Sequence, residues 1–356
     1  MRIEYMTPRL PGAFLLSEIL YFLLYITGET GVWKSMSLCV ILYTAFCGRD
    51  GMSFLYLLES IRNPLLDALM SAVTKLGEET TFLVIAILVF WCVDKDRGYY
   101  VMTVGFLGTM LNQFLKMTFR IPRPWVLDPE FSIVETAREA ASGFSFPSGH
   151  STSAVGTFGA VGLSSERKWV RRICFGICVL VPFSRMYLGV HTPWDVLAGA
   201  ATAIMLLWLM RPMAFGVQGT TMRNLIGLQL GCSVIMLLYA AFFPFSIPEG
   251  ELHNLQSGVK NGYTMLGSIV GLMIAYPLEK KYVNFETKAI WWVQCLKAVL
   301  GLALVLAVKE GLRAPLDLLF GGRMIARSVR YACVVLTAGV IWPSTFKWFS
   351  KIGVKR

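Results

Sequence analysis

The sequence has little charge and only three histidines, and both shortages narrow what the protein can be. Charged residues make up 15% of its 356 residues, whereas 55% are hydrophobic and the mean hydropathy is +0.59. A soluble domain with a wetted surface carries more charge than this. Lipid is therefore the solvent for most of the chain, and a histidine in so apolar a sequence requires an explanation.

The eight cysteines lack a metal-binding or disulfide pattern. All of them lie within apolar segments. Cys174 and Cys178 share a helix face, but without a nearby histidine or a further cysteine they are interpreted as small core residues. The sequence therefore predicts no disulfide framework and no zinc site.

Apolar runs that are long enough to cross a bilayer recur from end to end of the chain. A crossing takes about 20 residues in a helix. Because lipid offers no partner for unpaired backbone groups, these runs predict an all-α, polytopic membrane bundle. The expected spans are 99–118, 148–165, 169–189, 193–210, 222–246, 261–278, 289–308 and 324–345, with a shorter one at 80–93.

The net charge of +11 raises the question of a nucleic-acid partner, and the placement of the basic residues answers it. Fifteen of them lie on one set of alternate loops, in groups at 95–97, 167–172, 211–223, 280–288 and 347–356, whereas the opposite loops hold eight. By the positive-inside rule the richer set of loops is cytoplasmic. The surplus charge is a topology signal, so no nucleic-acid partner is expected.

The N-terminal part of the chain, 1–51, forms an apolar extension with two open interpretations. Residues 12–27 and 32–47 lack the charged region and small-residue cleavage site of a secretory signal. They could form one or two extra membrane helices, or the working protein could start at Met52. From Met52 the sequence predicts an amphipathic surface helix, a break at Pro64 and a second helix that leads to the first span.

Three polar clusters lie at the external ends of predicted spans. In the first, Lys116 is followed after six residues by Arg123 and Pro124. The second is the stretch PSGH at 147–150, and the third is SRMYLGVHTPWD at 184–195. Ionisable groups near lipid are costly, so residues of this kind are candidates for function.

These clusters are suited to binding a multiply charged anion. Lys116, Arg123 and Arg185 cannot all pair with protein carboxylates, and planar guanidinium groups suit phosphate oxygens. The backbone N–H groups of Ser148 and Gly149 at a helix N-terminus would add donors, and a glycine permits close approach of the anion. A phosphate group is the expected ligand.

A histidine and a carboxylate in the third cluster are candidates for catalysis. His191 and Asp195 are four residues apart, so on a helix they share a face, and the carboxylate can hold one imidazole nitrogen while the other attacks. Each residue alone also has an ordinary structural explanation, and the conjunction of three clusters favours the catalytic one. Glu78 and Glu79 are interpreted as an acidic pair at a helix N-terminus, with a role at the site as the alternative.

The motifs K-x6-R-P, P-S-G-H and S-R-x5-H-x3-D resemble the three signature motifs of the type 2 phosphatidic acid phosphatase superfamily, and every motif position is filled. The resemblance covers residues 60 to 210 and implies the family's six-helix core. The chain is therefore expected to comprise the extension at 1–51, a phosphatase core at 52–211 and additional transmembrane helices at 212–356.

The resemblance also implies roles for individual residues. His191 would be the nucleophile that forms a phosphohistidine, Asp195 would orient it, and His150 would be the general acid for the leaving oxygen. No cofactor or metal is expected, because fixed cations can neutralise the transition-state charge. Vanadium haloperoxidases share the anion-binding residues but are soluble, so the hydropathy argues against that activity. Phosphate would be bound by Lys116, Arg123, Ser148, Gly149 and Arg185.

The substrate is the least defined part of this prediction. A site at external helix ends favours a lipid phosphate whose tail stays in the bilayer, so we expect an integral membrane enzyme of a bacterial plasma membrane with its site facing outward. Undecaprenyl diphosphate or a related lipid phosphate is preferred, because bacterial members of the family with external sites commonly act on such lipids. A lipid phosphotransferase stays open as an alternative, as does a phosphatase of soluble sugar phosphates, since the extra helices resemble the glucose-6-phosphatases in number. The sequence does not indicate an oligomeric state.

Overall fold

The structure is a computed structural model that describes residues 51–139, 141–216, 219–242 and 252–349. Within these ranges all regular secondary structure is helical, which confirms the predicted all-α class. Apart from Gly51, the N-terminal extension lies outside the described residues, so both interpretations of it stay open.

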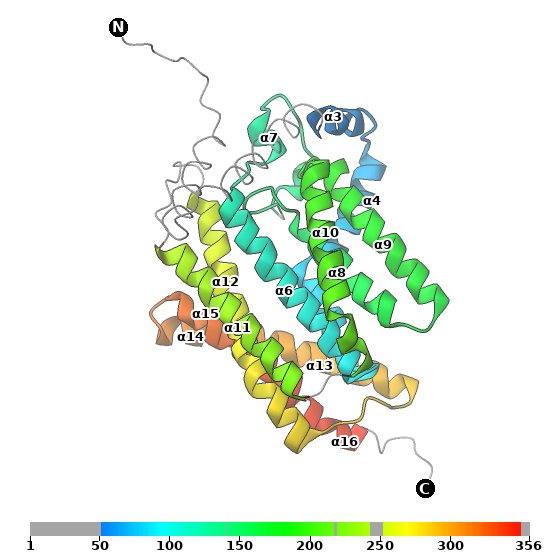
Figure 1. The fold of residues 1–356 in the computed structure, drawn as a ribbon, viewed down its shortest axis with the longest axis vertical. Coiled ribbons are helices and arrows are strands. Elements are labelled where there is room, and N and C mark those ends of the chain that lie inside the picture. The colour runs from blue at the N-terminus through cyan, green and yellow to red at the C-terminus, as the bar shows by residue number, and fades with distance from the viewer. Residues whose placement is uncertain (1–50, 140, 217–218, 243–251, 350–356) are drawn as a thin grey trace, which may run out of the picture.

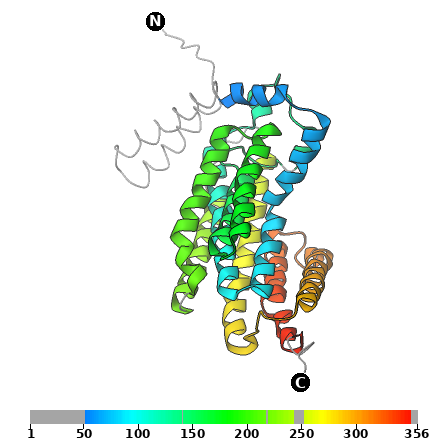
Figure 2. The same cartoon turned by 90° about the vertical axis from the view of Figure 1, so that its right-hand side faces the viewer.

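The first part of the described chain forms the helices that surround the three motifs (Figure 1). In Figure 2, α3 lies across the upper end of the bundle, and α4 and α5 run down its side. Asn63 caps α4 and Pro64 occupies its first turn, so the break predicted at Pro64 separates two helices. These elements are α3 (Met52–Ser60), α4 (Pro64–Thr74), α5 (Glu79–Cys92), α6 (Lys95–Phe119), α7 (Pro124–Leu127), α8 (Gly149–Ser164), α9 (Lys168–Tyr187) and α10 (Pro193–Met210).

The remaining helices pack beside α5 and α6 and form the C-terminal extension of the bundle (Figure 1). They are α11 (Gly219–Phe242), α12 (Leu252–Leu278), α13 (Trp291–Gly311), α14 (Arg313–Leu319), α15 (Met324–Leu336), which continues as a π-helix through Ile341, and α16 (Phe346–Phe349). The predicted spans at 261–278 and 289–308 correspond to α12 and α13, and that at 324–345 covers α15 and the helical turns that follow it. The span at 222–246 corresponds to α11 as far as Phe242, and its last residues lie outside the described ranges.

Four helical stretches in the described residues are long and apolar enough to cross a membrane. Helices α6, α8 and α9 are not among them. The reason is visible in α6, which buries polar side chains such as Asn112 and Lys116 inside the bundle. In α6, polar side chains that face the site lower the hydropathy of the helix, whereas α8, with 16 residues, is shorter than a full span. The four stretches are Pro193–Phe215, Gly219–Ala241, Trp291–Leu319 and Met324–Phe349.

Small residues let the core helices approach closely around the motifs. A Cβ atom at Gly105 in α6 would clash with the ring of Phe82 in α5, and one at Gly199 in α10 would lie 2.5 Å from the carbonyl oxygen of Ser148. Association of helices in lipid depends on such close packing, because lipid tails are as apolar as leucine side chains. The contact at Gly199 holds the start of α8 against α10, which brings the second motif next to the third.

Candidate active site

The three motifs meet at one end of the bundle, where α6 ends and α8 and α10 begin. A cavity of about 150 Å³ opens there. Five of the residues predicted for the site line this cavity, although they come from three segments that are distant in the sequence. They are Lys116, Arg123, Gly149, His150 and His191.

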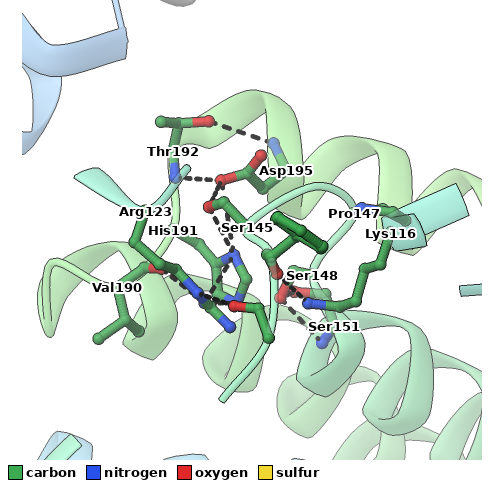
Figure 3. Close-up of polar contacts among 12 residues, drawn as sticks. Lys116, Arg123, Ser145, Pro147, Ser148, Ser151, Val190, His191, Thr192 and Asp195 are labelled. Atoms are coloured by element: carbon green, nitrogen blue, oxygen red, sulfur yellow. Dashed lines mark hydrogen bonds and ion pairs between the residues drawn. The ribbon is translucent and has the colours of Figure 1, made fainter. Parts of the chain in front are cut away.

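His191 lies in the turn before α10, and its imidazole is 1% exposed (Figure 3). Its Nδ1 is 3.5 Å from Oδ2 of Asp195. The expectation that both residues share a helix face was wrong, because α10 begins only at Pro193. The contact forms because Asp195 occupies the first turn of α10 and its carboxylate reaches back in a capping box with Thr192.

Further donors fix the Asp195 carboxylate, as Figure 3 shows. Oδ2 accepts a hydrogen bond from the backbone N–H of Thr192 at 2.8 Å and another from the hydroxyl of Ser145 at 2.7 Å. The Ser145 hydroxyl oxygen also lies 3.5 Å from Nδ1 of His191. Carboxylate, serine and imidazole therefore form one buried polar group.

The guanidinium of Arg123 connects the first motif with the third and with the segment that precedes the second. Nε and Nη2 donate to the carbonyl oxygens of Gly143 and Ser142, each at 3.0 Å, and Nη1 donates to that of Val190 at 2.9 Å. Nη1 also lies 2.8 Å from Nε2 of His191. When Nδ1 carries the ring proton toward Asp195, Nε2 has its lone pair on this side, facing the cavity wall that Arg123 forms.

Lys116 and its neighbour one helical turn earlier hold the segment before α8. The ammonium of Lys116 donates to the carbonyl oxygen of Phe144. The amide of Asn112 donates to the carbonyl oxygen of Pro147 at 3.2 Å and to the hydroxyl of Thr152 at 3.3 Å. The C-terminal part of α6 therefore positions the second motif through two polar side chains.

The second motif lies at the N-terminus of a helix, as the sequence predicted, and Ser148 is the N-cap residue of α8. The hydroxyl of Ser148 accepts a hydrogen bond from the N–H of Ser151, and α8 begins at Gly149. The N–H of Ser148, however, donates to the carbonyl oxygen of Asp195 at 2.9 Å. Of the two amides expected to bind phosphate, the one of Ser148 is therefore engaged within the protein, whereas Gly149 lines the cavity.

The His150 side chain lies between the cavity and the connection from α4 to α5. Its Nε2 atom is buried and has no hydrogen-bond partner among the described residues. A Cβ atom at position 77 would lie 2.9 Å from the His150 carbonyl oxygen, so only glycine fits there without a shift of the backbone. An unpartnered ring nitrogen at the cavity wall is available to a ligand.

Arg185 is fully buried and is not part of the cavity lining, although it is close enough to His191 for its charge to lower the pKa of that residue. Its Nη1 donates to the hydroxyl of Thr74 in α4 at 2.9 Å, while Nε and Nη2 have no hydrogen-bond partner among the described residues. Buried guanidinium donors without partners are costly. An anion in the adjacent cavity would supply the missing acceptors.

Burial and neighbouring charges shift the pKa values of two residues that lie between the helices, His191 and Arg123. Burial lowers the pKa of His191 well below its usual range, and the nearby charges of Arg123, Arg185 and Lys116 lower it further. Burial also lowers the pKa of Arg123 to about 10, against the attraction of Asp195. Burial and the surrounding cations therefore favour the neutral form of the His191 imidazole.

Sequence reasoning did not find four residues that shape this site, namely Ser145, Asn112, Thr74 and Gly77. Ser145 gave the clearest signal, as a polar residue between Phe144 and Phe146. The contacts of Thr74 and Asn112 bridge 111 and 35 residues, and no local pattern reports such pairings. Within the described residues, no group of three or more His, Cys, Asp or Glu side chains is arranged to hold a metal ion.

Comparison with known proteins identifies the family. The pattern of the PAP2 superfamily matches residues 98–218, and that of the "PAP2 superfamily phosphatase, transmembrane extension" matches residues 263–354. Phosphatidylglycerophosphatase B of Bacillus subtilis is 31% identical over 42% of this chain and 76% of its own. The chain belongs to the PAP2 superfamily.

Other PAP2 relatives carry different names. A probable sphingosine-1-phosphate phosphatase of Dictyostelium discoideum is 32% identical over 41% of this chain and 38% of its own. The undecaprenyl-diphosphatase BcrC of Bacillus subtilis is 27% identical over 42% of this chain and 76% of its own. A crystal structure of a PAP2-type phosphatidylglycerolphosphate phosphatase from Bacillus subtilis aligns with a TM-score of 0.39 at 26% identity, over 58% of this chain and 98% of that one. The protein is thus a PAP2 membrane phosphatase with a transmembrane extension.

Proposed function

We propose that the protein hydrolyses a lipid phosphate or diphosphate through a phosphohistidine on His191, without a metal ion. The observation that carries this proposal is the placement of the His191 imidazole. Nδ1 faces Asp195 at 3.5 Å, Nε2 faces the cavity wall at Arg123, and burial keeps the ring neutral. A neutral imidazole that is held at one nitrogen can use the lone pair of the other.

In the proposed reaction, Nε2 of His191 attacks phosphorus, a P–N bond forms and the bond to the leaving oxygen breaks. The carboxylate of Asp195 stabilises the positive charge that develops on the ring. His150 donates a proton to the leaving oxygen and then accepts one from the water that cleaves the P–N bond. The buried, unpartnered Nε2 of His150 at the cavity supports this assignment.

The phosphate would be bound by the cations around the cavity. Lys116 and Arg123 line it, Arg185 is buried near His191 with two nitrogens in need of acceptors, and the Gly149 amide faces the cavity at the start of α8. The phosphate would take over the contact that Nη1 of Arg123 now makes with His191. Fixed donors of this kind stabilise the transition state without reorganisation.

A lipid substrate fits the location of the site and the names of the relatives. The cavity lies at one end of membrane helices, where a head group can reach His191 while the tail stays in the bilayer. The relatives include a phosphatidylglycerophosphatase, a probable sphingosine-1-phosphate phosphatase and an undecaprenyl-diphosphatase. Undecaprenyl diphosphate or a related lipid phosphate is our preferred substrate, and the charge distribution of the loops supports an outward-facing site in a plasma membrane.

The experiment is phosphate release by the purified protein in detergent from undecaprenyl diphosphate, phosphatidate, phosphatidylglycerol phosphate and glucose 6-phosphate. We expect activity on the lipids and little on the sugar phosphate. Turnover of glucose 6-phosphate alone would replace this proposal with a soluble substrate, and release that requires an added alcohol acceptor would indicate a phosphotransferase.

The nucleophile is tested by trapping phosphoenzyme from a ³²P-labelled substrate. Label is expected in the wild type and not in His191→Asn. His253→Asn is the matched control, because His253 is exposed on α12 and outside the cavity. Label that persists in His191→Asn would refute the role of His191.

A further inference from the structure

A second cavity, of about 230 Å³, lies between the core and the C-terminal extension. On the core side it is lined by α5 and α6, and on the other side by α12, α13 and α15. Almost all of its lining is apolar, with residues such as Leu83, Ile87, Phe106, Leu272 and Val305. The cavity runs along α5 from Glu79 to Phe90, a stretch of helix that is roughly 16 Å long.

The two cavities share a wall at Glu79. This residue begins α5 and lines both the catalytic cavity and the apolar one. Its Oε1 atom is buried and has no hydrogen-bond partner among the described residues. Gly105, in the lining of the catalytic cavity, directly precedes Phe106, in the lining of the apolar one. The apolar cavity therefore adjoins the catalytic cavity at Glu79 and extends along α5 away from it.

The apolar cavity also opens sideways, toward the surroundings of the bundle. Val84 on α5 and Leu306 on α13 both line it, and they are 38% and 56% exposed. In Figure 2, α13 stands at the outer edge of the bundle, beyond α15. In a membrane this opening between α5 and α13 faces lipid chains.

We propose that this cavity binds the hydrocarbon chain of the phosphorylated substrate while its phosphate occupies the catalytic cavity. The outer wall of the chain site is then supplied by the C-terminal extension, through α12, α13 and α15. This inference rests on the proposed function, because it requires a lipid substrate. The adjacency of the two cavities at Glu79 favours the substrate's own chain over a separate bilayer lipid, since a phosphate bound in the catalytic cavity leaves its chain next to the apolar one.

The physical basis of chain binding here is shape. A chain that leaves the bilayer was already in an apolar solvent, so little hydrophobic free energy is gained by its transfer. Affinity comes instead from close dispersion contacts with the cavity wall. A bulky side chain that fills the cavity must therefore reduce the binding of long chains without affecting short ones that do not reach it.

The test compares hexadecyl phosphate with butyl phosphate, which share a primary alkoxide leaving group and differ only in chain length. We expect Leu306→Trp to lower the ratio of kcat/KM for the long over the short substrate by about tenfold or more, the lower end of what a steric change in an apolar pocket produces. Val299→Trp is the matched control, because Val299 is 64% exposed on the same helix and lies outside the cavity. Its ratio should equal that of the wild type.

A second variant keeps the proposal testable if Leu306→Trp does not fold. Val84→Trp narrows the same opening from α5 and should lower the ratio in the same direction. If the wild type hydrolyses hexadecyl phosphate but the folded tryptophan variants keep its chain-length ratio, the chain site is overturned and the proposed function stands. If the wild type hydrolyses no lipid or alkyl phosphate, the proposed function itself fails.

Discussion

Ser145→Ala should impair catalysis although Ser145 belongs to none of the three signature motifs. Its hydroxyl donates to Oδ2 of Asp195 at 2.7 Å, and the side chain is 1% exposed. The N–H of Thr192 donates to the same oxygen at 2.8 Å. Removing the hydroxyl therefore leaves the carboxylate less well held at the moment when His191 becomes positively charged.

The size of the effect follows from the type of hydrogen bond. A hydrogen bond to a charged group contributes about 1.5 to 3 kcal/mol. If that contribution is realised mainly in the transition state, kcat falls by about 10- to 100-fold. Because Ser145 does not line the cavity, KM should change much less than kcat.

The assay is steady-state phosphate release with the best substrate of the panel. Ser145→Thr keeps the hydroxyl and should recover most of the activity. Ser164→Ala is the control for loss of a buried serine, because Ser164 lies at the end of α8 that is far from the site. Its hydroxyl donates to carbonyl oxygens of its own helix, the shorter bond being the one to Ala160. Wild-type kcat in Ser145→Ala, or an equal loss in Ser164→Ala, would refute this reasoning.

Four further outcomes are expected. His191→Ala should be inactive on all substrates, whereas His150→Ala should retain more relative activity on p-nitrophenyl phosphate than on an alkyl phosphate. The reason is that general acid catalysis contributes its usual factor of about 10² to 10⁴ only where the leaving group needs a proton. Equal losses of His150→Ala on both substrates would remove the acid role of His150. Activity should survive EDTA and be inhibited by vanadate, and a loss in EDTA that Mg²⁺ restores would contradict the metal-free mechanism. A cysteine placed in the loop at 128–142 should react with an impermeant thiol reagent in intact cells and one at 166–168 should not, with the reverse labelling refuting the topology. The folded-state pKa of His191 lies below the value of about 6.5 that the residue regains on unfolding, so as the pH falls the unfolded state takes up the proton before the folded state does. The midpoint temperature of thermal unfolding should therefore fall more steeply below about pH 6.5 in the wild type than in His191→Gln.

The helical framework could be predicted from the sequence because lipid imposes a simple rule on it. Apolar runs must be helical, and the expected spans at 99–118, 148–165, 169–189 and 193–210 correspond to α6, α8, α9 and α10. The convergence of Lys116, Arg123, Gly149, His150 and His191 on one cavity followed from placing the motifs at the same ends of those spans. The division of the chain at 52–211 and 212–356 stays a prediction.

Other features depend on tertiary contacts that no local pattern reports. The spacing of His191 and Asp195 suggested a shared helix face, but Pro193 starts the helix later and a capping box makes the contact instead. The N–H of Ser148 was expected to face a ligand and is taken by the carbonyl of Asp195 from another helix. Glu79 begins its helix as expected, yet its position between two cavities became visible only once α5 was packed against the C-terminal helices.

The contacts of Arg123 have a consequence for the biogenesis of the protein. Its guanidinium is held by carbonyl groups of the segment before α8 and by that of Val190, 67 residues further along the chain. The full set of contacts can therefore form only after the chain has been synthesised as far as Val190 and that residue has packed beside Arg123. During translation the lysine and the arginine of the first motif are therefore made before the anion site is assembled, and the site is complete only when the turn with Val190 and His191 has docked.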